Sequence, residues 1–274
     1  MIRFVLFVHR TWKKYTKDEI TVYAAQAAFF TLLAAVPFLM VLISAIQMVP
    51  GLSKMDLEES MMSIVPEMFH SLLFAITDDL FTRSPATILS ITAITAIWSA
   101  SRSMFGIEKG LNRIWGDHVS RSYLLSRLIC TGYTFVFILM FVMMLGFSVF
   151  GGIIGNFLIA RFPYIGKAAL MLINFRMLIT FFFMFLFFWN LYTCLPRRKL
   201  DWKSQIPGAF FSSVSWSAFS FAFSIYFENF SNYSYIYGSL TAIILLTLWL
   251  YFCLCILFIG AEINCVLSTT QREP

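Results

Sequence analysis

Glu262 is an acidic residue inside one of the longest apolar runs of this sequence, residues 248–268, and Asn264 follows it two positions later. An ionisable side chain inside a membrane is costly, so it marks a functional site by default. Two interpretations of Glu262 stay open. It forms a structural ion pair with a cytoplasmic arginine such as Arg102 or Arg113, or it has a gating or proton-coupled role.

Arg176 is a second charge within an apolar run, and it lies beside Asn174 and ahead of the phenylalanine-rich residues 181–189. Its side chain either snorkels to the outer headgroups or binds an anionic headgroup or substrate. Arg176 and Glu262 are expected near opposite surfaces of the membrane, which argues against a direct pair between them.

The sequence lacks the motifs of familiar enzymes. His9, His70 and His118 fall in separate segments, so they are not expected to form one metal or acid-base site. No phosphate-binding loop, H-E-x-x-H helix or G-x-S-x-G elbow occurs. The five cysteines lie in or beside apolar runs and are predicted to be core residues. We therefore expect no enzymatic activity, no metal and no cofactor.

The composition excludes a water-soluble protein. Of the 274 residues, 59% are hydrophobic and 12% are charged, whereas soluble domains carry about 25% charged residues. Disordered, collagen-like and disulfide-scaffold proteins need compositions opposite to this one. A membrane protein is the class that remains.

Apolar stretches long enough to cross a membrane, about 20 residues, recur along the chain. One further stretch is shorter and rich in small and hydroxyl residues, among them Thr92 and Thr95, which favours a place inside a helix bundle. The sequence predicts an all-α, polytopic membrane protein with a single domain, residues 1–274. Its six transmembrane helices are expected at about 24–49, 84–101, 128–155, 169–195, 206–227 and 237–266.

The first of these spans contains two features that interrupt an apolar helix. Gln26 places an amide near its start, and Pro37 falls in its middle. Proline removes one backbone hydrogen bond and predicts a kink. The kink is either a hinge or simply the shape of the helix.

Lysine and arginine are distributed unevenly between the expected loops. With the N-terminus inside, most of the 20 basic residues fall in the inner segments, as the positive-inside rule requires. Both termini are therefore predicted to be cytoplasmic. The net charge of +6 indicates anionic lipid headgroups as partners rather than nucleic acid.

Residues 1–20 are predicted to form an interfacial amphipathic helix and not a signal peptide, because the apolar run is short and no cleavage site follows it. The first outer loop, 51–83, is predicted to hold short amphipathic helices. The N-terminal helix has an apolar stripe, Val5, Val8, Trp12 and Tyr15, with Arg10, Lys13, Lys14 and Lys17 around it.

Four sets of short motifs follow one another along nearly the whole chain. They are Ala24 to Leu33 with Pro37; Trp98 to Ser101 with Gly110 to Trp115; Leu195-Pro196 with Pro207-Gly208-Ala209; and Tyr237 to Leu240 with Trp249-Leu250-Tyr251 and Gly260 to Asn264. In this order and spacing they resemble the YihY/BrkB family of bacterial inner-membrane proteins.

The resemblance implies a six-helix protein of the bacterial cell membrane, with Asn112, Glu262 and Asn264 at recurring polar positions of the family. Some members have been labelled ribonuclease BN, which we regard as a mislabel because this sequence offers no nuclease metal cluster. Others are named for serum resistance or linked to lipid or lipopolysaccharide export.

Two functions are weighed. The first is a transporter that moves or flips an amphipathic lipid or lipid-linked substrate, and the alternative is a membrane scaffold that binds lipids or envelope protein partners without transport. For the transporter, Pro37 is the candidate hinge. The candidate substrate-binding or pathway residues are Arg176, Glu262, Asn264, Gln26, Asn112, Arg102, Thr92 and Thr95.

Overall fold

A computed structural model describes residues 2–47, 74, 77–78, 85–116, 122, 124–139, 176–229 and 239–270. The amphipathic helices expected within 51–83 fall almost wholly outside these ranges. The same holds for residues 140–155 of the third expected span and 169–175 of the fourth.

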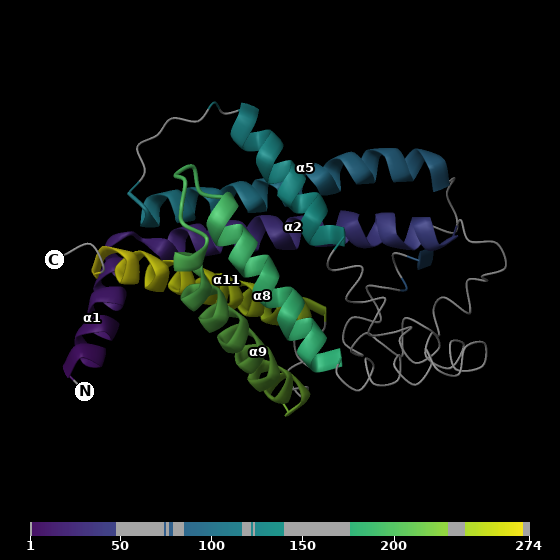
Figure 1. Ribbon diagram of the computed structural model, residues 1–274. Helices are drawn as coiled ribbons and strands as arrows, with labels where there is room; N and C mark the ends of the chain where they lie inside the picture. Colours follow the sequence, from purple (N-terminus) through teal and green to yellow (C-terminus); the bar gives the residue numbers. More distant parts are fainter. Residues whose placement is uncertain are drawn as a thin grey trace, which may run out of the picture. The chain divides into compact units, whose positions relative to one another are not determined.

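Every regular secondary-structure element in the described part of the chain is a helix, which confirms the all-α class there. The helices are α1 (Ile2–Lys17), α2 (Ile20–Gln47), α5 (Pro85–Ile114), Leu124–Leu139, α8 (Arg176–Cys194), the short 3-10 helix η2 (Lys203–Gln205), α9 (Ile206–Asn229) and α11 (Ser239–Thr270) (Figure 1).

Within the described ranges, three helical stretches are long and apolar enough to cross a membrane: Ile20–Val41, Lys203–Tyr226 and Ile243–Thr269. They coincide with the spans expected at 24–49, 206–227 and 237–266. Two shorter apolar helices, Leu124–Leu139 and Thr180–Cys194, lie within or beside the third and fourth expected spans. The count of six spans stays a prediction.

The short span expected at 84–101 forms the first part of α5, a continuous helix of 30 residues, Pro85–Ile114, which runs on past residue 101. The helix continues because no proline interrupts it after its first residue. It ends where Gly116 adopts a left-handed φ of 61° and its amide donates to the carbonyl of Arg113 at 3.1 Å, a common helix termination.

The chain forms two compact units that are not consecutive in sequence. The first comprises Met1–Asp18, Leu111–Ala218 and Ile256–Pro274, and the second comprises Glu19–Gly110 and Phe219–Cys255. Helices α5, α9 and α11 each contribute to both. The expected single domain stays a prediction.

In the second unit, α2 and α5 pack through small residues. The Ser103 hydroxyl donates to the Ala27 carbonyl of α2 at 3.0 Å and lies 2.6 Å from the Thr31 hydroxyl. A Cβ on Gly106 of α5 would lie 3.5 Å from the Ala27 Cβ. Such small and hydroxyl residues allow close helix packing in a membrane.

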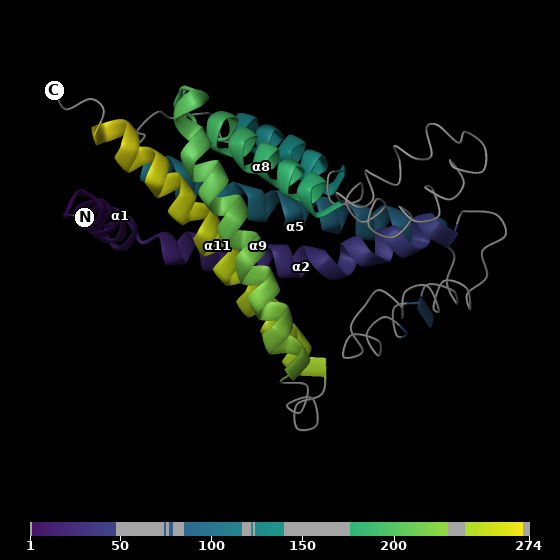
Figure 2. The ribbon, with the colours of Figure 1, turned by 60° about the horizontal axis from the view of Figure 1, so that its bottom comes forward.

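In the first unit, the start of α9 packs against the end of α11 (Figure 2). A Cβ on Gly208 would collide with the Gly260 carbonyl, and one on Gly260 would collide with the Ser212 hydroxyl and lie 2.7 Å from the Gly208 carbonyl. Glycine suits both positions, because each added Cβ would meet a backbone carbonyl of the other helix and also side chains that are held by hydrogen bonds, Asn264 at Gly208 and Ser212 and Tyr192 at Gly260. The end of α8 is buried in the same unit through Phe188, Leu191 and Tyr192, and so is Leu195, the residue that follows α8.

We predict that Gly260→Ala lowers stability by about 2–3 kcal/mol, the cost of overpacking a tight contact. The measurement is thermal unfolding of the purified protein in detergent. The matched control is Gly132→Ala on the helix Leu124–Leu139, where a Cβ meets nothing within 4 Å, and where alanine is expected to be neutral or to stabilise by up to about 1 kcal/mol. Equal melting temperatures for Gly260→Ala and the wild type would contradict the close approach.

Candidate functional site

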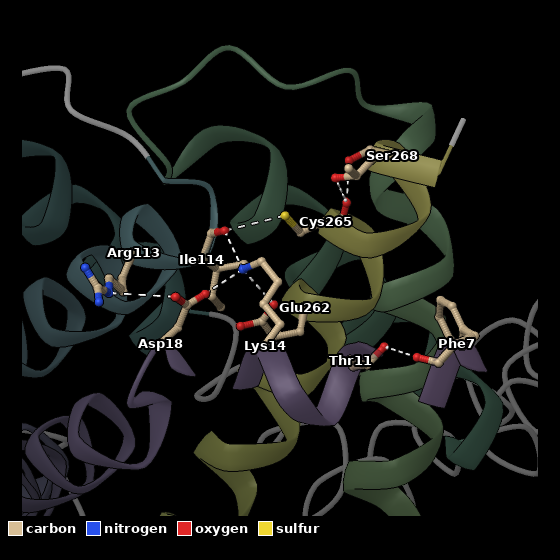
Figure 3. A network of polar contacts seen from close by, with 10 residues as sticks. Phe7, Thr11, Lys14, Asp18, Arg113, Ile114, Glu262, Cys265 and Ser268 are labelled. Carbon is tan, nitrogen blue, oxygen red and sulfur yellow. Dashed lines mark hydrogen bonds and ion pairs between the residues drawn. The ribbon is translucent and has the colours of Figure 1, made fainter. Parts of the chain in front are cut away.

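The ammonium group of Lys14 is the centre of a polar cluster in the first unit (Figure 3). Its Nζ lies 2.6 Å from Oδ2 of Asp18, one turn further along the chain, and 2.9 Å from Oε2 of Glu262 on α11. It also donates to the backbone carbonyl of Ile114 at 2.7 Å. One cation therefore joins α1, the end of α5 and α11.

Glu262 is the most buried member of this cluster, with 0% of its side chain exposed, whereas Lys14 is 28% exposed. The contact between them is an ion pair, and the second carboxylate oxygen has no hydrogen-bond partner among the described residues. Glu262 is thus a carboxylate removed from water and held mainly by one counter-charge.

Asp18 brings a second cation into the cluster, because its Oδ1 lies 3.8 Å from Nε of Arg113. Arg113 is about half exposed, so this outer pair is weaker than the pair that Lys14 makes with Glu262. With both carboxylates ionised, the two acidic and two basic side chains balance. A neutral cluster is what a partly buried site requires.

The Ile114 carbonyl explains why a cation lies at this place. Ile114 is the last residue of α5, and the final carbonyls of a helix have no partner within the helix. Lys14 donates to this carbonyl, and the Cys265 thiol of α11 donates to it at 3.4 Å. A positive charge here also interacts favourably with the negative end of the α5 dipole.

Asn264 forms hydrogen bonds at the start of α9, a helix end where backbone amides need acceptors. Its Oδ1 accepts from the Gly208 amide at 2.7 Å, and its Nδ2 donates to the Gln205 carbonyl at 3.2 Å and side chain at 3.1 Å. The first amides of a helix lack internal partners. Asn264, fully buried, therefore acts as a cap for α9 supplied by α11.

Tyr192 joins α8 to the same crossing. Its hydroxyl donates to the Leu257 carbonyl of α11 at 2.6 Å and lies 2.7 Å from the Ser212 hydroxyl of α9. Neither Tyr192 nor Ser212 was singled out from sequence, because a lone hydroxyl in an apolar run carries no pattern that distinguishes a packing contact.

Asn112 fixes the loop that follows α8. Its Oδ1 accepts from the Arg197 backbone amide at 2.8 Å, and the Arg197 guanidinium donates to Ser126 at 3.3 Å. The Asn112 side chain is buried, and its Nδ2 finds no acceptor within the described part of the chain.

The predicted site residues fall into two groups. Asn112, Glu262 and Asn264 belong to the first unit, where each joins different helices. The backbone of Arg176 also belongs there, as the first residue of α8, but its side chain lies outside the description. The second unit holds Gln26, Pro37, Thr92, Thr95 and Arg102.

The partner expected for Glu262 was wrong. Arg102 instead places its guanidinium 4.8 Å from the Trp98 ring and 5.6 Å from the Phe30 ring, and Arg113 pairs with Asp18. The i, i+4 spacing of Lys14 and Asp18 indicates their pairing with each other, but no pattern in the sequence links Lys14 to Glu262.

The electrostatic surroundings keep Lys14 protonated. Burial lowers the pKa of Lys14, but the hydrogen bond to Asp18 and the negative charge of Glu262 outweigh it, so the pKa lies above the ordinary value of 10.5. The cation is present throughout the physiological pH range.

This arrangement suits holding two helices together. The carboxylate of Glu262 is sealed from water, and no three His, Cys, Asp or Glu side chains gather as metal ligands in the described ranges. What the cluster offers is an electrostatic contact between α1 and the end of α11, which we call the Lys14–Glu262 latch.

The chain is similar to known bacterial proteins along almost its whole length. The family described as virulence factor BrkB matches residues 11–274. The chain is 30% identical over 271 residues to the putative ribonuclease-like protein YfkH of Bacillus subtilis, which covers 98% of this chain and 97% of that protein. A UPF0761 membrane protein of Alteromonas mediterranea is 27% identical over 93% of this chain and 85% of its own length. No solved structure matches.

We predict non-additive losses of stability at the latch. Lys14→Met leaves the buried Glu262 carboxylate without its counter-charge and is expected to cost about 2–4 kcal/mol. Glu262→Gln leaves Lys14 with Asp18 and the Ile114 carbonyl and is expected to cost about 1 kcal/mol. The double variant should lose less than the sum. Thermal unfolding of the four proteins in a double-mutant cycle measures the difference.

The control for this cycle is Lys13→Met, an exposed neighbour on the same helix, which is expected to change stability by no more than about 0.5 kcal/mol. Strictly additive losses for Lys14→Met and Glu262→Gln would show that the latch contributes no coupling.

We also predict a pH dependence on the alkaline side. Because the pKa of Lys14 is higher in the folded than in the unfolded chain, its contribution is complete below pH 10.5 and is lost as the pH rises through the folded value. The stability difference between wild type and Lys14→Met should therefore stay constant from about pH 8 to about pH 10 and shrink above that. A difference that disappears near pH 8 would contradict this assignment.

Proposed function

The chain belongs to the virulence factor BrkB family, and on that premise we propose that it moves an amphipathic lipid or lipid-linked molecule across the bacterial cell membrane. Several relatives are named membrane proteins, and three helical stretches among the described residues are apolar and long enough to span a membrane. The proposal includes both termini in the cytoplasm and six spans. It assigns the protein no chemical reaction, cofactor or nucleic-acid partner.

The single observation that carries the proposal is the burial of Glu262 against Lys14. A buried ion pair adds little net stability, and well-packed apolar residues of the same size often do better. A protein that only has to remain inserted therefore gains little from this pair. The best-attested use of a buried ion pair is to hold a protein in one of two conformational states. A transporter requires two such states.

In the proposed cycle the latch is closed in the state described here. Opening separates α1 from the end of α11, and the carboxylate of Glu262 then becomes accessible to water or to a substrate headgroup. Arg176 is proposed to bind an anionic headgroup. In the second unit, Gln26, Thr92, Thr95 and Arg102 are proposed to contact substrate, and Pro37 is proposed as a hinge.

A second function, a scaffold that binds lipids or envelope proteins without transport, is favoured by a different observation. Asn264 forms hydrogen bonds with α9, and Asn112 accepts one from the loop after α8. The side chain of Glu262 is fully buried. All three residues then serve helix packing alone.

A leaflet-resolved lipid translocation assay in proteoliposomes separates the two functions. Headgroup-labelled anionic and zwitterionic lipids are followed with and without a proton gradient, for wild type, Glu262→Gln and Arg176→Ala at matched folding and reconstitution. The matched charge controls are Glu19→Gln and Arg198→Ala, both exposed.

We expect wild type and both controls to accelerate lipid movement, and Glu262→Gln to reduce it at least tenfold, an effect of about 1.4 kcal/mol. Wild-type vesicles that match protein-free vesicles under every condition would reject transport and leave the scaffold.

A further inference from the structure

The helix α1 has three faces, and only one of them contacts the rest of its unit. Thr11, Tyr15 and Lys14 lie on the inner face, where Thr11 and Tyr15 are buried and Lys14 pairs with Glu262. Tyr15 was expected in the apolar stripe of an amphipathic helix, but only 7% of it is exposed. Two further faces are left uncovered within this unit.

One uncovered face is apolar. Val5, Val8 and Trp12 are 59%, 49% and 64% exposed, and the Trp12 ring stacks on the buried Tyr15 ring at 5.8 Å. The stacking orients an exposed indole, the side chain that prefers the boundary between hydrocarbon and headgroups.

The other uncovered face is basic. Arg10, Lys13 and Lys17 are exposed, and α1 contains no acidic residue at all. The nearest carboxylate along the chain, that of Asp18, is taken up by Lys14. The positive charge on this face therefore faces outward without internal compensation from α1.

From these faces we propose that α1 binds the anionic surface of the membrane and that this binding holds the Lys14–Glu262 latch closed. Val5, Val8 and Trp12 enter the interface, and Arg10, Lys13 and Lys17 bind lipid phosphates. We call these six residues the docking face. Anionic lipid fits better than a protein partner because apolar and basic residues on adjacent faces of one helix match the layers of a bilayer surface.

Binding and the latch are coupled because one rigid helix carries both. Lys14 lies between Trp12 and Lys17 on α1, so a helix that leaves the membrane surface takes Lys14 away from Glu262. The lipid surface thereby becomes a regulator of the end of α11. This inference holds whether or not the protein transports lipid, since it concerns only the position of α1.

Trp12 is the natural probe of docking. The full-length protein is placed in nanodiscs of phosphatidylcholine alone or of equimolar phosphatidylcholine and phosphatidylglycerol, with or without bromine on the upper acyl chains. The quenching of tryptophan fluorescence is measured for the wild type and for Trp12→Phe. The difference between the two gives the quenching of Trp12 alone.

Cys265 is the natural probe of the latch, because its buried thiol donates to the same Ile114 carbonyl as Lys14. Labelling by a charged maleimide is followed in a Cys194→Ser background, which removes the exposed cysteine. Peptide mass spectrometry identifies the labelled residue.

The test variant is Arg10→Gln/Lys13→Gln/Lys17→Gln, and the matched control is Arg198→Gln/Lys199→Gln/Lys203→Gln in the exposed segment around the start of η2. Each basic residue near an anionic surface strengthens adsorption roughly fivefold, so the triple change is expected to weaken docking by roughly a hundredfold. Both triple variants must match the wild type in monodispersity and in melting temperature in detergent.

We expect bromolipid quenching of Trp12 and slow labelling of Cys265 in the anionic nanodiscs. The docking variant, or removal of phosphatidylglycerol, should reduce the quenching and speed the labelling several-fold, while the control triple variant changes neither. If the quenching of Trp12 is the same with and without phosphatidylglycerol, and the same in the docking variant as in the wild type, the proposed binding of anionic lipid is wrong. Loss of quenching with unchanged Cys265 labelling would overturn the coupling to the latch.

Discussion

The structure of the first unit depends on one ammonium group. Lys14 neutralises the buried Glu262 carboxylate, bonds to Asp18 and satisfies the last carbonyl of α5. Each of these groups is costly to bury alone. Asp18 also has Arg113, and the Ile114 carbonyl also accepts from Cys265, so Glu262 is the group that depends most on Lys14. The contact of α1 with the ends of α5 and α11 is centred on this one cation.

A second constraint acts beside the first at the crossing of α9 and α11. The approach at Gly208 and Gly260 brings backbone to backbone, which leaves the first amides of α9 without room for water. Asn264 supplies the missing acceptor from α11. Because Asn264 follows Glu262 by two positions on one helix, the cap of α9 and the latch on α1 are mechanically linked. Movement of the end of α11 changes both.

Composition and apolar runs were sufficient to predict the helical class and the positions of α2, α9 and α11, because a run of that length has few alternatives in a membrane. The span expected at 84–101 covers only the small-residue first half of the helix that begins at Pro85, because the amphipathic second half has a different composition although nothing breaks the helix between them. Glu262 and Asn264 were found as costly polar groups. Their partners were not, because partners are set by which helix ends meet in space.

The asymmetry of the latch indicates how it opens. Lys14 is partly exposed, and its long side chain reaches other oxygen acceptors, including lipid phosphates, once α1 moves. Glu262 has no such choice, because it is fully enclosed and depends on Lys14 as its counter-charge. Loss of the contact therefore costs more at Glu262 than at Lys14 for as long as the carboxylate stays enclosed. A ligand or lipid that stabilises the exposed carboxylate, or a variant that removes its charge, shifts the latch toward the open state, whereas changes on the exposed side of Lys14 shift it only through the position of α1.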